Sequence, residues 1–441
     1  MTKEIKVIDY VMGTGKTKYI FEYMQANPHK KYIYVTPLLS EAEMRAVEQC
    51  GSISMVSPVV DERGNTKSQH MLELLKEGLN ISTTHTMFKN LRKQHLKQIE
   101  YWGYTLIIDE TVDFIESYND YNQADIKDLS ERGDLLVHED MNGRVSMEWD
   151  ISEGNTYEDL KGMCDAGLVY STKKPHTMLN VQVPPVIIDA AAEVFVLTYL
   201  YEHSLMRSFM DLHGFTHKKL IIPHLEDKTK EVKERIRTNL KIVEVKAADN
   251  YLKNTYKAAL SHSWWNTMIK KNTATDLFKF CSNWLNNNLE HKDSFFFTCP
   301  KVLVSSENKQ RRTKSVLEKA KLRYFSNPLG ESVTEEILDT QGKKHKVKKT
   351  VNTKWLFSGT KATNDFCDRK MCFYLINVYP NLAVQHYLGD YGLKIDEDMY
   401  ALSEMLQFIW RGNIRTEGGE MTVYIASPRM KKLLQDWIGI H

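Results

Sequence analysis

The sequence predicts an α/β protein built on parallel sheets, and three observations lead to this prediction. Short β-branched or aromatic runs alternate with helical patterns, which is typical of strand–helix–strand units. The 441 residues suffice for two to three domains at about 150 residues each. Hydrophobic residues make up 42% and charged residues 26% of the chain, the balance of a globular protein with its own core.

The segment before Asp113 alternates candidate strands with candidate helices. The strands are short runs rich in β-branched and aromatic residues, at Ile5–Ile8, Lys31–Val35, Leu79–Thr84 and Tyr104–Ile108. The helices lie at Lys18–Gln25, Ser40–Gln49 and Met87–Tyr101. In the first helix Ile20, Phe21 and Met24 share one face. Strands separated by helices predict a parallel sheet that is covered on both faces.

This rhythm is lost over residues 113–185, where acidic and polar loops alternate. We interpret this region as an insertion in the first domain. Within it, Met141-Asn-Gly-Arg144 predicts a hairpin, because Asn-Gly favours a tight turn. After it, Val186–Asp189 and Val194–Thr198 resume the strand character.

A charged stretch, Glu226–Arg237, marks the link to a second α/β unit. Its candidate strands are Ser294–Cys299, Trp355–Ser358, Met371–Asn377 and Met421–Ala426. Its candidate helices are Thr273–Leu289, Asp398–Ile409 and Pro428–Trp437. The predicted domains are residues 1–215, with the insertion at about 113–185, and residues 216–441.

Charge and cysteine content exclude several classes of protein. The 59 Lys and Arg residues against 57 Asp and Glu leave a net charge of +2, which excludes a bulk polycation but allows a local basic groove. No two of the six cysteines form a Cys-X-X-Cys pair, so neither a disulfide framework nor a zinc ribbon is expected. The sequence has no signal-peptide core and no apolar run of about 18 residues, which predicts a soluble cytoplasmic protein.

A candidate phosphate-binding loop, Gly13-Thr-Gly-Lys-Thr17, lies between the first strand and the first helix. Its glycines allow backbone N–H groups to approach phosphate oxygens, and the helix N-terminus favours their negative charge. We expect Gly13, Thr14, Gly15, Lys16 and Thr17 to bind ATP, with Lys16 on the β- and γ-phosphates and Thr17 on Mg²⁺. The full motif is incomplete, because Tyr10 occupies its first glycine position.

A second candidate element, Leu106-Ile-Ile-Asp-Glu110, is an apolar strand that ends in two acids. Asp109 stands at the carboxyl end of the strand, where a second carboxylate ligand to Mg²⁺ is needed. Glu110 suits the base that orients and deprotonates an attacking water. Together with the loop upstream, this pair predicts NTP hydrolysis.

With these motifs the chain resembles superfamily 2 helicases, specifically the compact helicase-like ATPases of bacteriophages. It is also distantly similar to the helicase half of herpesvirus origin-binding proteins. The resemblance follows the order of the family's motifs over nearly the whole chain. The matching segments, from motif I to motif VI, are Gly13–Thr17, Tyr34–Leu38, Ser82–His85, Asp109–Val112, Val196–Tyr199, Phe296–Thr298, Ser358–Asp365 and Gln407–Arg415.

The resemblance implies two tandem RecA-like domains, with ATP in the cleft between them and single-stranded nucleic acid across both. It implies that four threonines face the sugar-phosphate backbone, namely Thr36, Thr84, Thr298 and Thr360. A translocating enzyme gains from such contacts, because holding phosphates lets it step without sequence preference. Thr198 would couple the state of ATP to domain movement.

Motif VI departs from the family's pattern, because Trp410 replaces a glycine and the two arginines are four residues apart rather than three. Either Arg411 or Arg415 could neutralise charge on the γ-phosphate. In a continuous helix Gln407 would share one face with both arginines. Gly412-Asn413 could instead break that helix, and both arrangements stay open.

A lysine-rich segment between motifs IV and V predicts a β-hairpin, with strands at Glu336–Asp339 and Lys346–Val351 around Thr340-Gln-Gly342. Its lysines are Lys343, Lys344, Lys346, Lys348 and Lys349. They could bind phosphates, or they could only protect an edge strand from pairing with another chain. We expect Lys343, Lys344 and Lys346 to contact nucleic acid.

The expected function is that of an ATP-dependent nucleic-acid translocase, an ATP hydrolase of the DNA-helicase type in phage replication or recombination. Its cofactors would be ATP and Mg²⁺, and its partner DNA in preference to RNA, with other replication or recombination proteins as further candidates. A phage-encoded protein would act in the host cytoplasm without a membrane. Two alternatives stay open: a double-strand DNA translocase or branch-migration enzyme, and a nucleotide-gated origin- or nucleic-acid-binding module.

Overall fold

The structure is a computed structural model of the 441-residue chain. It describes all residues except 1–2, 43–52, 61–65, 141–143, 150–156, 175, 254–257, 306–313, 339–343, 361–364 and 440–441. Of residues 332–338 and 344–351 it describes the backbone alone.

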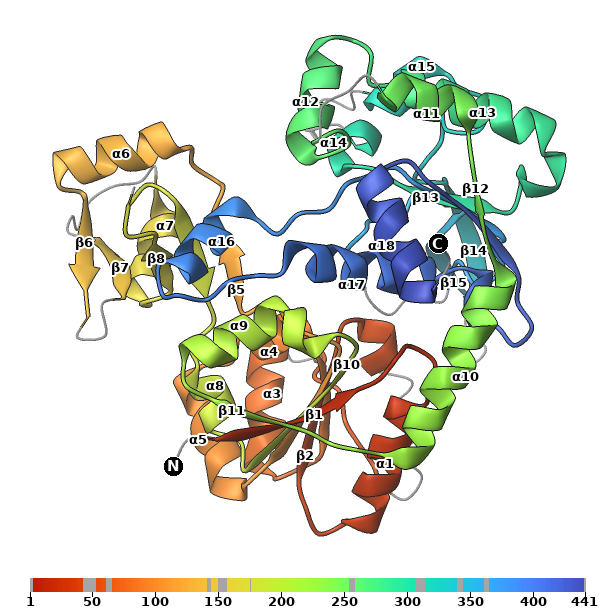
Figure 1. The fold of residues 1–441 in the computed structure, drawn as a ribbon. Helices are drawn as coiled ribbons and strands as arrows, with labels where there is room; N and C mark the ends of the chain where they lie inside the picture. The colour runs from red at the N-terminus through yellow and green to blue at the C-terminus, as the bar shows by residue number, and fades with distance from the viewer. Residues whose placement is uncertain are drawn as a thin grey trace. The chain divides into compact units, whose positions relative to one another are not determined.

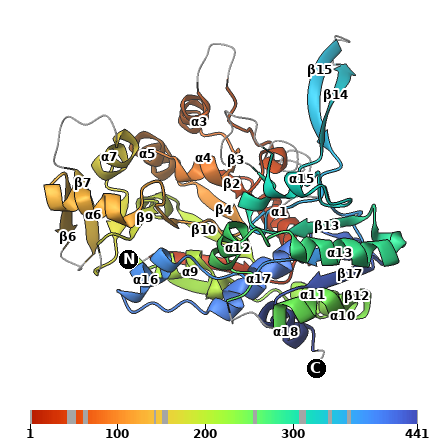
Figure 2. The same cartoon turned by 90° about the horizontal axis from the view of Figure 1, so that it is seen from above.

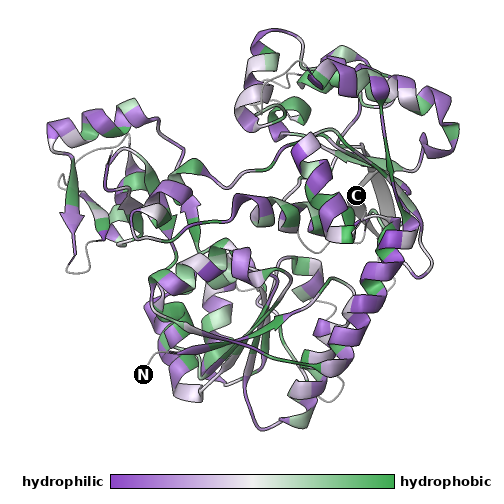
Figure 3. Ribbon diagram, viewed as in Figure 1, coloured by the Kyte–Doolittle hydropathy of each residue, from purple (hydrophilic) through white to green (hydrophobic). Residues whose placement is uncertain are grey.

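The chain folds into two units (Figure 1). The first contains Met1–Thr229 and Pro380–Tyr400, and the second contains Lys230–Tyr379 and Ala401–His441. The sequence had indicated a boundary at residue 215 and had assigned residues 380–400 to the second domain. The chain leaves the first unit inside helix α10 (Pro223–Asn239), which carries mostly hydrophilic residues (Figure 3). The segment at residues 380–400 joins the first unit because Val384, Tyr387 and Leu388 are buried in its core.

A six-stranded parallel sheet forms the centre of the first unit, in the order β11-β1-β10-β4-β2-β3. Its strands are β1 (Glu4–Asp9), β2 (Tyr32–Thr36), β3 (Ile81–Thr84), β4 (Thr105–Asp109), β10 (Glu193–Thr198) and β11 (Thr216–Lys219). The helices that connect or flank them are α1 (Lys16–Ala26), α3 (Lys67–Lys76), α4 (His85–Lys89), α5 (Lys93–Trp102), α8 (Val186–Asp189), the 3-10 helix η2 (Tyr201–His203) and α9 (Leu205–Leu212). The predicted parallel α/β architecture is confirmed here.

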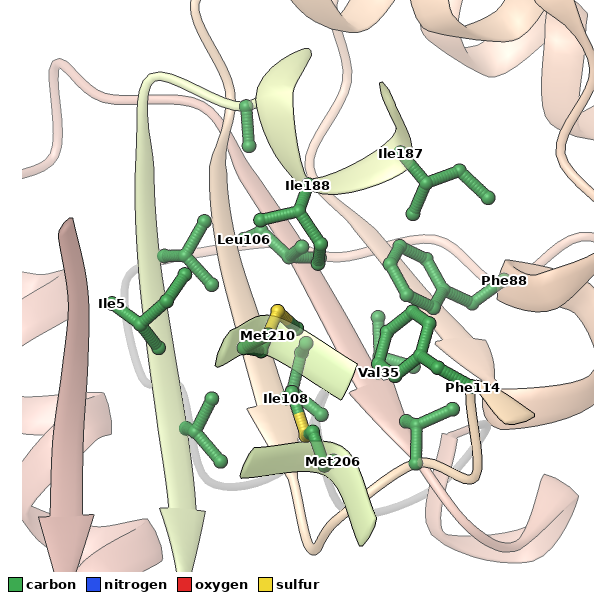
Figure 4. Close-up of a cluster of buried hydrophobic side chains, with 14 of the residues drawn as sticks. Ile5, Val35, Phe88, Leu106, Ile108, Phe114, Ile187, Ile188, Met206 and Met210 are labelled. Atoms are coloured by element: carbon green, nitrogen blue, oxygen red, sulfur yellow. The ribbon is translucent and has the colours of Figure 1, made fainter. Parts of the chain in front are cut away.

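Both faces of this sheet are buried, as expected for parallel strands with helices on either side. On one face, Val35, Leu106 and Ile108 pack against Ile188 of α8 and Met206 of α9 (Figure 4). The opposite face lies under the predicted apolar stripe of α1, which is formed by Ile20, Phe21 and Met24. Successive strand residues alternate between the two cores, which fixes the strand register. Because all six strands are parallel, their carboxyl ends lie at one edge of the sheet.

The region predicted as an insertion forms an antiparallel sheet in the order β5-β9-β8-β7-β6. Its elements are β5 (Ile115–Ser117), α6 (Gln123–Arg132), β6 (Leu135–Glu139), β7 (Val145–Trp149), α7 (Glu158–Asp165), β8 (Val169–Ser171) and β9 (Leu179–Gln182). Strands β6 and β7 pair as the predicted hairpin, although residues 141–143 of its turn lie outside the described part of the chain. Phe114 and Ile115 belong to the core of the first unit, so the peripheral part of this lobe begins only after β5.

Residues 380–400 contain helix α16 (Leu382–Gly389) and contact this lobe through Asp390 and Tyr391, which follow the helix. The Asp390 carboxylate accepts a hydrogen bond from the backbone N–H of Lys173 at 2.6 Å, and the Tyr391 hydroxyl accepts one from Val145 at 3.1 Å. Lys173 also lies over the Tyr391 ring, with its Nζ 4.9 Å from the ring centroid.

The second unit has a four-stranded parallel sheet in the order β12-β17-β16-β13. Its strands are β12 (Leu240–Val243), β13 (Phe295–Thr298), β16 (Met371–Tyr374) and β17 (Met421–Ile425). Its helices are α11 (Lys246–Lys253), α12 (His262–Lys270), α13 (Asp276–Asn287), η3 (Leu289–His291), α14 (Lys301–Val304), α15 (Val316–Ala320), α17 (Glu397–Ile409, beginning in the first unit), η5 (Asn413–Arg415) and α18 (Pro428–Ile438). The lysine-rich segment forms the hairpin β14 (Glu331–Leu338) and β15 (Lys344–Val351), which extends away from this sheet (Figure 2).

Several local predictions differ from the structure. Val186–Asp189 forms the helix α8 rather than a strand. Pro184-Pro185 precedes it and favours a helical start, and of its residues only Ile187 and Ile188 are buried against the sheet. The single helix expected at Met87–Tyr101 is divided into α4 and α5. The strand expected at Trp355–Ser358 contributes only a bridge from Trp355 to Phe297. Most of the helix expected at Ser40–Gln49 lies outside the described residues.

A candidate nucleotide site at the carboxyl edge of the first sheet

The loop from Tyr10 to Gly15 connects β1 to α1 at the carboxyl edge of the sheet. Gly13 and Gly15 have φ of 76° and 97°, in the left-handed region that favours glycine. Gly15 directly precedes the 11-residue helix α1. A Cβ atom at Gly15 would have no heavy atom within 4 Å. The space around Gly15, at the N-terminus of α1, is therefore open, and a helix N-terminus is a position that can bind phosphate.

Hydrogen bonds inside the loop fix its shape. The Thr14 hydroxyl donates to the carbonyl of Val11 at 2.9 Å. The Lys16 Nζ donates to the carbonyls of Tyr10 at 2.8 Å and Val11 at 3.3 Å, and Lys16 is only 8% exposed. Burial lowers the pKa of Lys16, while the acids around it raise that pKa, most strongly Glu110 and Asp109. The cation is thus already held inside the loop, next to where phosphates would approach.

The acid pair stands at the end of β4, between β10 and β2. Glu110 has φ of 63°, an uncommon conformation for a residue with a side chain. Its backbone N–H donates to the carbonyl of Leu197 at 2.8 Å, and its carboxylate accepts a hydrogen bond from the Thr198 hydroxyl at 3.5 Å. The neighbouring strand β10 thereby holds Glu110 in a backbone conformation that costs about 1–3 kcal/mol.

A tyrosine that the sequence reasoning missed connects the acid pair to the loop. The Tyr34 hydroxyl donates to Asp109 Oδ2 at 2.5 Å, and the Thr17 side chain lies close enough to influence the pKa of Tyr34. Burial, followed by the charge of Glu110, raises the pKa of Asp109 to about 7. Tyr34 is one of two tyrosines in an ordinary strand pattern, so no sequence signal distinguishes it from a core residue.

Two of the predicted threonines stand beside this site. Thr36 ends β2 and Thr84 ends β3, and the two residues are paired in the sheet. The Thr36 hydroxyl donates to the Glu41 carboxylate at 3.1 Å. The Thr84 hydroxyl accepts a hydrogen bond from the backbone of Met87 at 3.2 Å and so caps α4. Both threonines therefore lie at the same edge of the sheet as the loop and the acid pair.

The predicted residues of the second unit are placed as follows. Thr298 ends β13 and is fully buried, and its hydroxyl has no hydrogen-bond partner among the described residues. Thr360 is half-buried, and its backbone N–H donates to Phe357 at 3.0 Å. Lys344 and Lys346 belong to β15, where only the backbone is described, and Lys343 lies outside the described residues.

Motif VI does not form the continuous helix that would place its three polar residues in one row. Helix α17 ends at Ile409, so Gln407 lies in the helix and Arg411 in the turn after it, each 6% exposed. Arg415 is half-buried in η5. Gly412 is required at the break, because a Cβ there would lie 2.6 Å from the Met421 sulfur.

Other candidate sites receive no support within the described part of the chain. No group of three or more His, Cys, Asp or Glu residues there could hold a metal ion, and all five described cysteines are free. No described helix is long and apolar enough to cross a membrane. Trp264, Trp265 and the phenylalanines at 295–297 are buried in the core of the second unit, so they pack there and are not available to stack on bases.

Comparisons with known proteins find similarity to a prophage-derived protein. The family model described as "YonV C-terminal Rossmann-like domain" matches residues 234–438. The chain is 28% identical over 453 residues to "SPbeta prophage-derived uncharacterized protein YonV" of Bacillus subtilis (strain 168), with 99% of each chain covered. The Rossmann-like match agrees with the parallel sheet of the second unit, and the prophage origin of this relative agrees with the predicted likeness to phage proteins.

Two solved structures are similar to the chain at low identity. One is titled "XPD_Helicase", with 12% identity, a TM-score of 0.48, and coverage of 100% of this chain and 95% of that chain. The other, "Structure of S. tokodaii Xpd4", has 12% identity, a TM-score of 0.43, and coverage of 100% and 94%. These matches do not support the predicted similarity to herpesvirus origin-binding proteins.

Proposed function

We propose that this protein is an ATP-dependent nucleic-acid translocase, a DNA helicase of a phage replication or recombination system. The observation that carries the proposal is the meeting of three elements at one sheet edge. These are the glycine loop with Lys16, the hydrogen bond from Tyr34 to Asp109 next to Thr17, and Glu110, whose carboxylate accepts a hydrogen bond from Thr198. A Rossmann-type sheet binds nucleotides at this edge. A loop, a hydroxyl, a carboxylate and a positioned base are the parts that ATP hydrolysis needs.

The donor set suits Mg²⁺, because Thr17 and Asp109 offer oxygen ligands beside an open phosphate position. When bound, Mg²⁺ would offset charge on the β- and γ-phosphate oxygens. In this assignment Lys16 leaves the loop carbonyls for the phosphates, and Glu110 orients the attacking water. Thr198 holds Glu110 and is the residue through which hydrolysis would act on β10.

We assign the remaining roles from the same proposal. Thr36 and Thr84, side by side at the ends of β2 and β3, would hold the sugar-phosphate backbone, together with Thr298 and Thr360 in the second unit. Thr36 and Thr298 are buried, so their hydroxyls would have to be uncovered by a local rearrangement to reach a phosphate. Lys343, Lys344 and Lys346 would add phosphate contacts from the hairpin. Gln407, Arg411 and Arg415 would act on the γ-phosphate, with one arginine as the finger.

The decisive experiment measures ATP turnover side by side with single-stranded DNA, duplex DNA, forks and RNA. Lys16→Ala and Glu110→Gln should each lower turnover by a factor of hundreds, because removing a stabiliser of developing charge costs about 3–4 kcal/mol. Lys18→Ala is the matched control, since this neighbouring lysine side chain is 83% exposed and pairs only at the surface with Glu22. Near-normal turnover in Lys16→Ala or Glu110→Gln, with the fold intact by circular dichroism, would refute the site.

The substrate panel also separates the alternatives. Stimulation by forks or junctions without strand separation would favour a double-strand translocase or branch-migration enzyme. ATP binding with negligible turnover on every nucleic acid would favour a nucleotide-gated binding module.

A further inference from the structure

Tyr34 occupies an unusual position for a core tyrosine. Its ring packs 5.4 Å from the ring of Phe21 beneath α1, and the residue is 3% exposed. A buried tyrosine hydroxyl requires a hydrogen-bond partner. Here the hydroxyl donates to Asp109, and the Thr17 side chain lies nearby; these are the two residues that we assign to the divalent cation. The hydroxyl therefore occupies a lone pair of Asp109 Oδ2 that a bound cation would use.

We propose that the Tyr34 hydroxyl is a placeholder for the nucleotide-bound cation, which must displace it, and that its displacement is transmitted through Glu41 to Thr36. This inference rests on the proposed function. A hydroxyl that donates to Asp109 Oδ2 and a cation that binds the same oxygen compete directly, because each needs the same electron pair. Without the cation, Tyr34 donates a hydrogen bond to the partly buried Asp109 carboxylate, which avoids the cost of leaving that acceptor without a donor.

In this proposal Glu41 is the acceptor that receives the displaced hydroxyl and connects it to Thr36. It lies close enough to Tyr34 and Asp109 to raise the pKa of both residues. Its carboxylate already accepts the Thr36 hydroxyl at 3.1 Å. A Tyr34 hydroxyl that turns from Asp109 to Glu41 competes with Thr36 for that carboxylate. Cation binding would thereby release the Thr36 hydroxyl, which stands two residues further along the same strand and is proposed to hold nucleic acid.

The test compares ATP affinity in excess Mg²⁺ and in EDTA, measured by titration with a fluorescent ATP analogue. In Tyr34→Phe the ratio of the two affinities should exceed the parent ratio by about tenfold or more, because a hydrogen bond to a charged group no longer opposes the cation. Affinity in EDTA should stay at the parent value. The matched control is Tyr32→Phe, which removes a hydroxyl from the same strand and the same core but one that donates to Asn27 at 2.9 Å.

The outcomes are distinct. A parent-like ratio in Tyr34→Phe shows that the tyrosine only packs, and a smaller ratio shows that it positions Asp109 for the cation; either result overturns the proposal. A parent protein that binds no ATP in either condition overturns the proposed function itself.

A second measurement tests the transmission to Thr36. In the parent, Mg²⁺-ATP should change the affinity for single-stranded DNA, and Tyr34→Phe should lose most of that change, since coupling between two ligands is reciprocal. If Mg²⁺-ATP changes the affinity of Tyr34→Phe for single-stranded DNA as much as that of the parent, the proposed transmission through Glu41 is wrong.

Discussion

Replacing Gly15 by alanine should separate the phosphate-binding role of the loop from its contribution to stability. The added Cβ would meet no heavy atom within 4 Å, so no steric clash is expected in the folded protein. The cost to the fold comes from φ of 97°, which an L-residue adopts at a penalty of about 1–2 kcal/mol. For a unit of this size that penalty lowers the melting temperature by a few degrees, at about 2–4 °C per kcal/mol.

The effect on ATP should be far larger than the effect on stability. The Cβ would stand in the open space in front of the α1 N-terminus, where the phosphates must approach the backbone N–H groups. Loss of one or two charge-assisted hydrogen bonds corresponds to about 3 kcal/mol, or roughly a hundredfold weaker binding. Calorimetric titration with ATP measures the affinity, and a thermal melt measures the stability of the same sample.

Gly133→Ala is the matched control for the backbone penalty. Gly133 has φ of 82°, and a Cβ there also meets nothing within 4 Å, but the residue ends α6 in the peripheral lobe. Both variants should lose a similar amount of stability, and only Gly15→Ala should lose affinity for ATP. If Gly15→Ala binds ATP within about threefold of the parent, the loop does not hold phosphate and the reasoning fails.

Four further predictions test other parts of the molecule. Arg411→Ala and Arg415→Ala should both retain ATP binding, and at least one should lose hydrolysis; parent rates in both would make the match to motif VI accidental. Residues 119–178 can be replaced by a short linker, since Tyr118 and Leu179 are already joined by a 2.9 Å backbone hydrogen bond. This replacement should spare basal ATPase more than nucleic-acid remodelling. Equal loss of both activities would place the lobe in the catalytic core. Burial opposes ionisation of Glu193, but hydrogen bonds from Lys30 and Lys6 dominate and lower its pKa to about 2. Glu193→Gln should therefore cost about 1 kcal/mol of unfolding free energy above pH 4.5, after allowance for solvent screening. This deficit, measured by urea unfolding, should fade as the pH falls towards 2. A deficit that does not change with pH would contradict the ion pair. The hairpin lysines to be changed to alanine are Lys343, Lys344, Lys346, Lys348 and Lys349. The change should weaken DNA binding and flatten the slope of log affinity against log salt concentration by about 0.7–0.9 per phosphate contact. An unchanged slope would show that these lysines are surface residues only.

The sequence by itself determined the parallel α/β architecture and the elements around the loop. Strand, glycine turn and helix follow one another within a few residues at Gly13–Thr17, so local propensity and spacing are sufficient to predict them. The same holds for the apolar run that ends in Asp109 and for the Asn-Gly hairpin of the lobe. Short apolar runs are less informative, because a buried strand and a buried helical turn have the same composition, and this is why Val186–Asp189 was wrongly predicted as a strand.

Only the tertiary structure decided which residues meet. The return of residues 380–400 to the first unit depends on burial of Tyr387 and Leu388 in a core built mostly from residues far earlier in the chain. After the helix ends at Ile409, Met421 packs so close to Gly412 that a Cβ there would lie 2.6 Å from its sulfur, a contact that the local sequence does not indicate. Tyr34 reaches Asp109 across 75 residues of sequence because β2 and β4 are neighbours in register, with Tyr34 opposite Ile107. Strand register is set by packing of the whole sheet, and a single strand's sequence carries no record of the partner beside it.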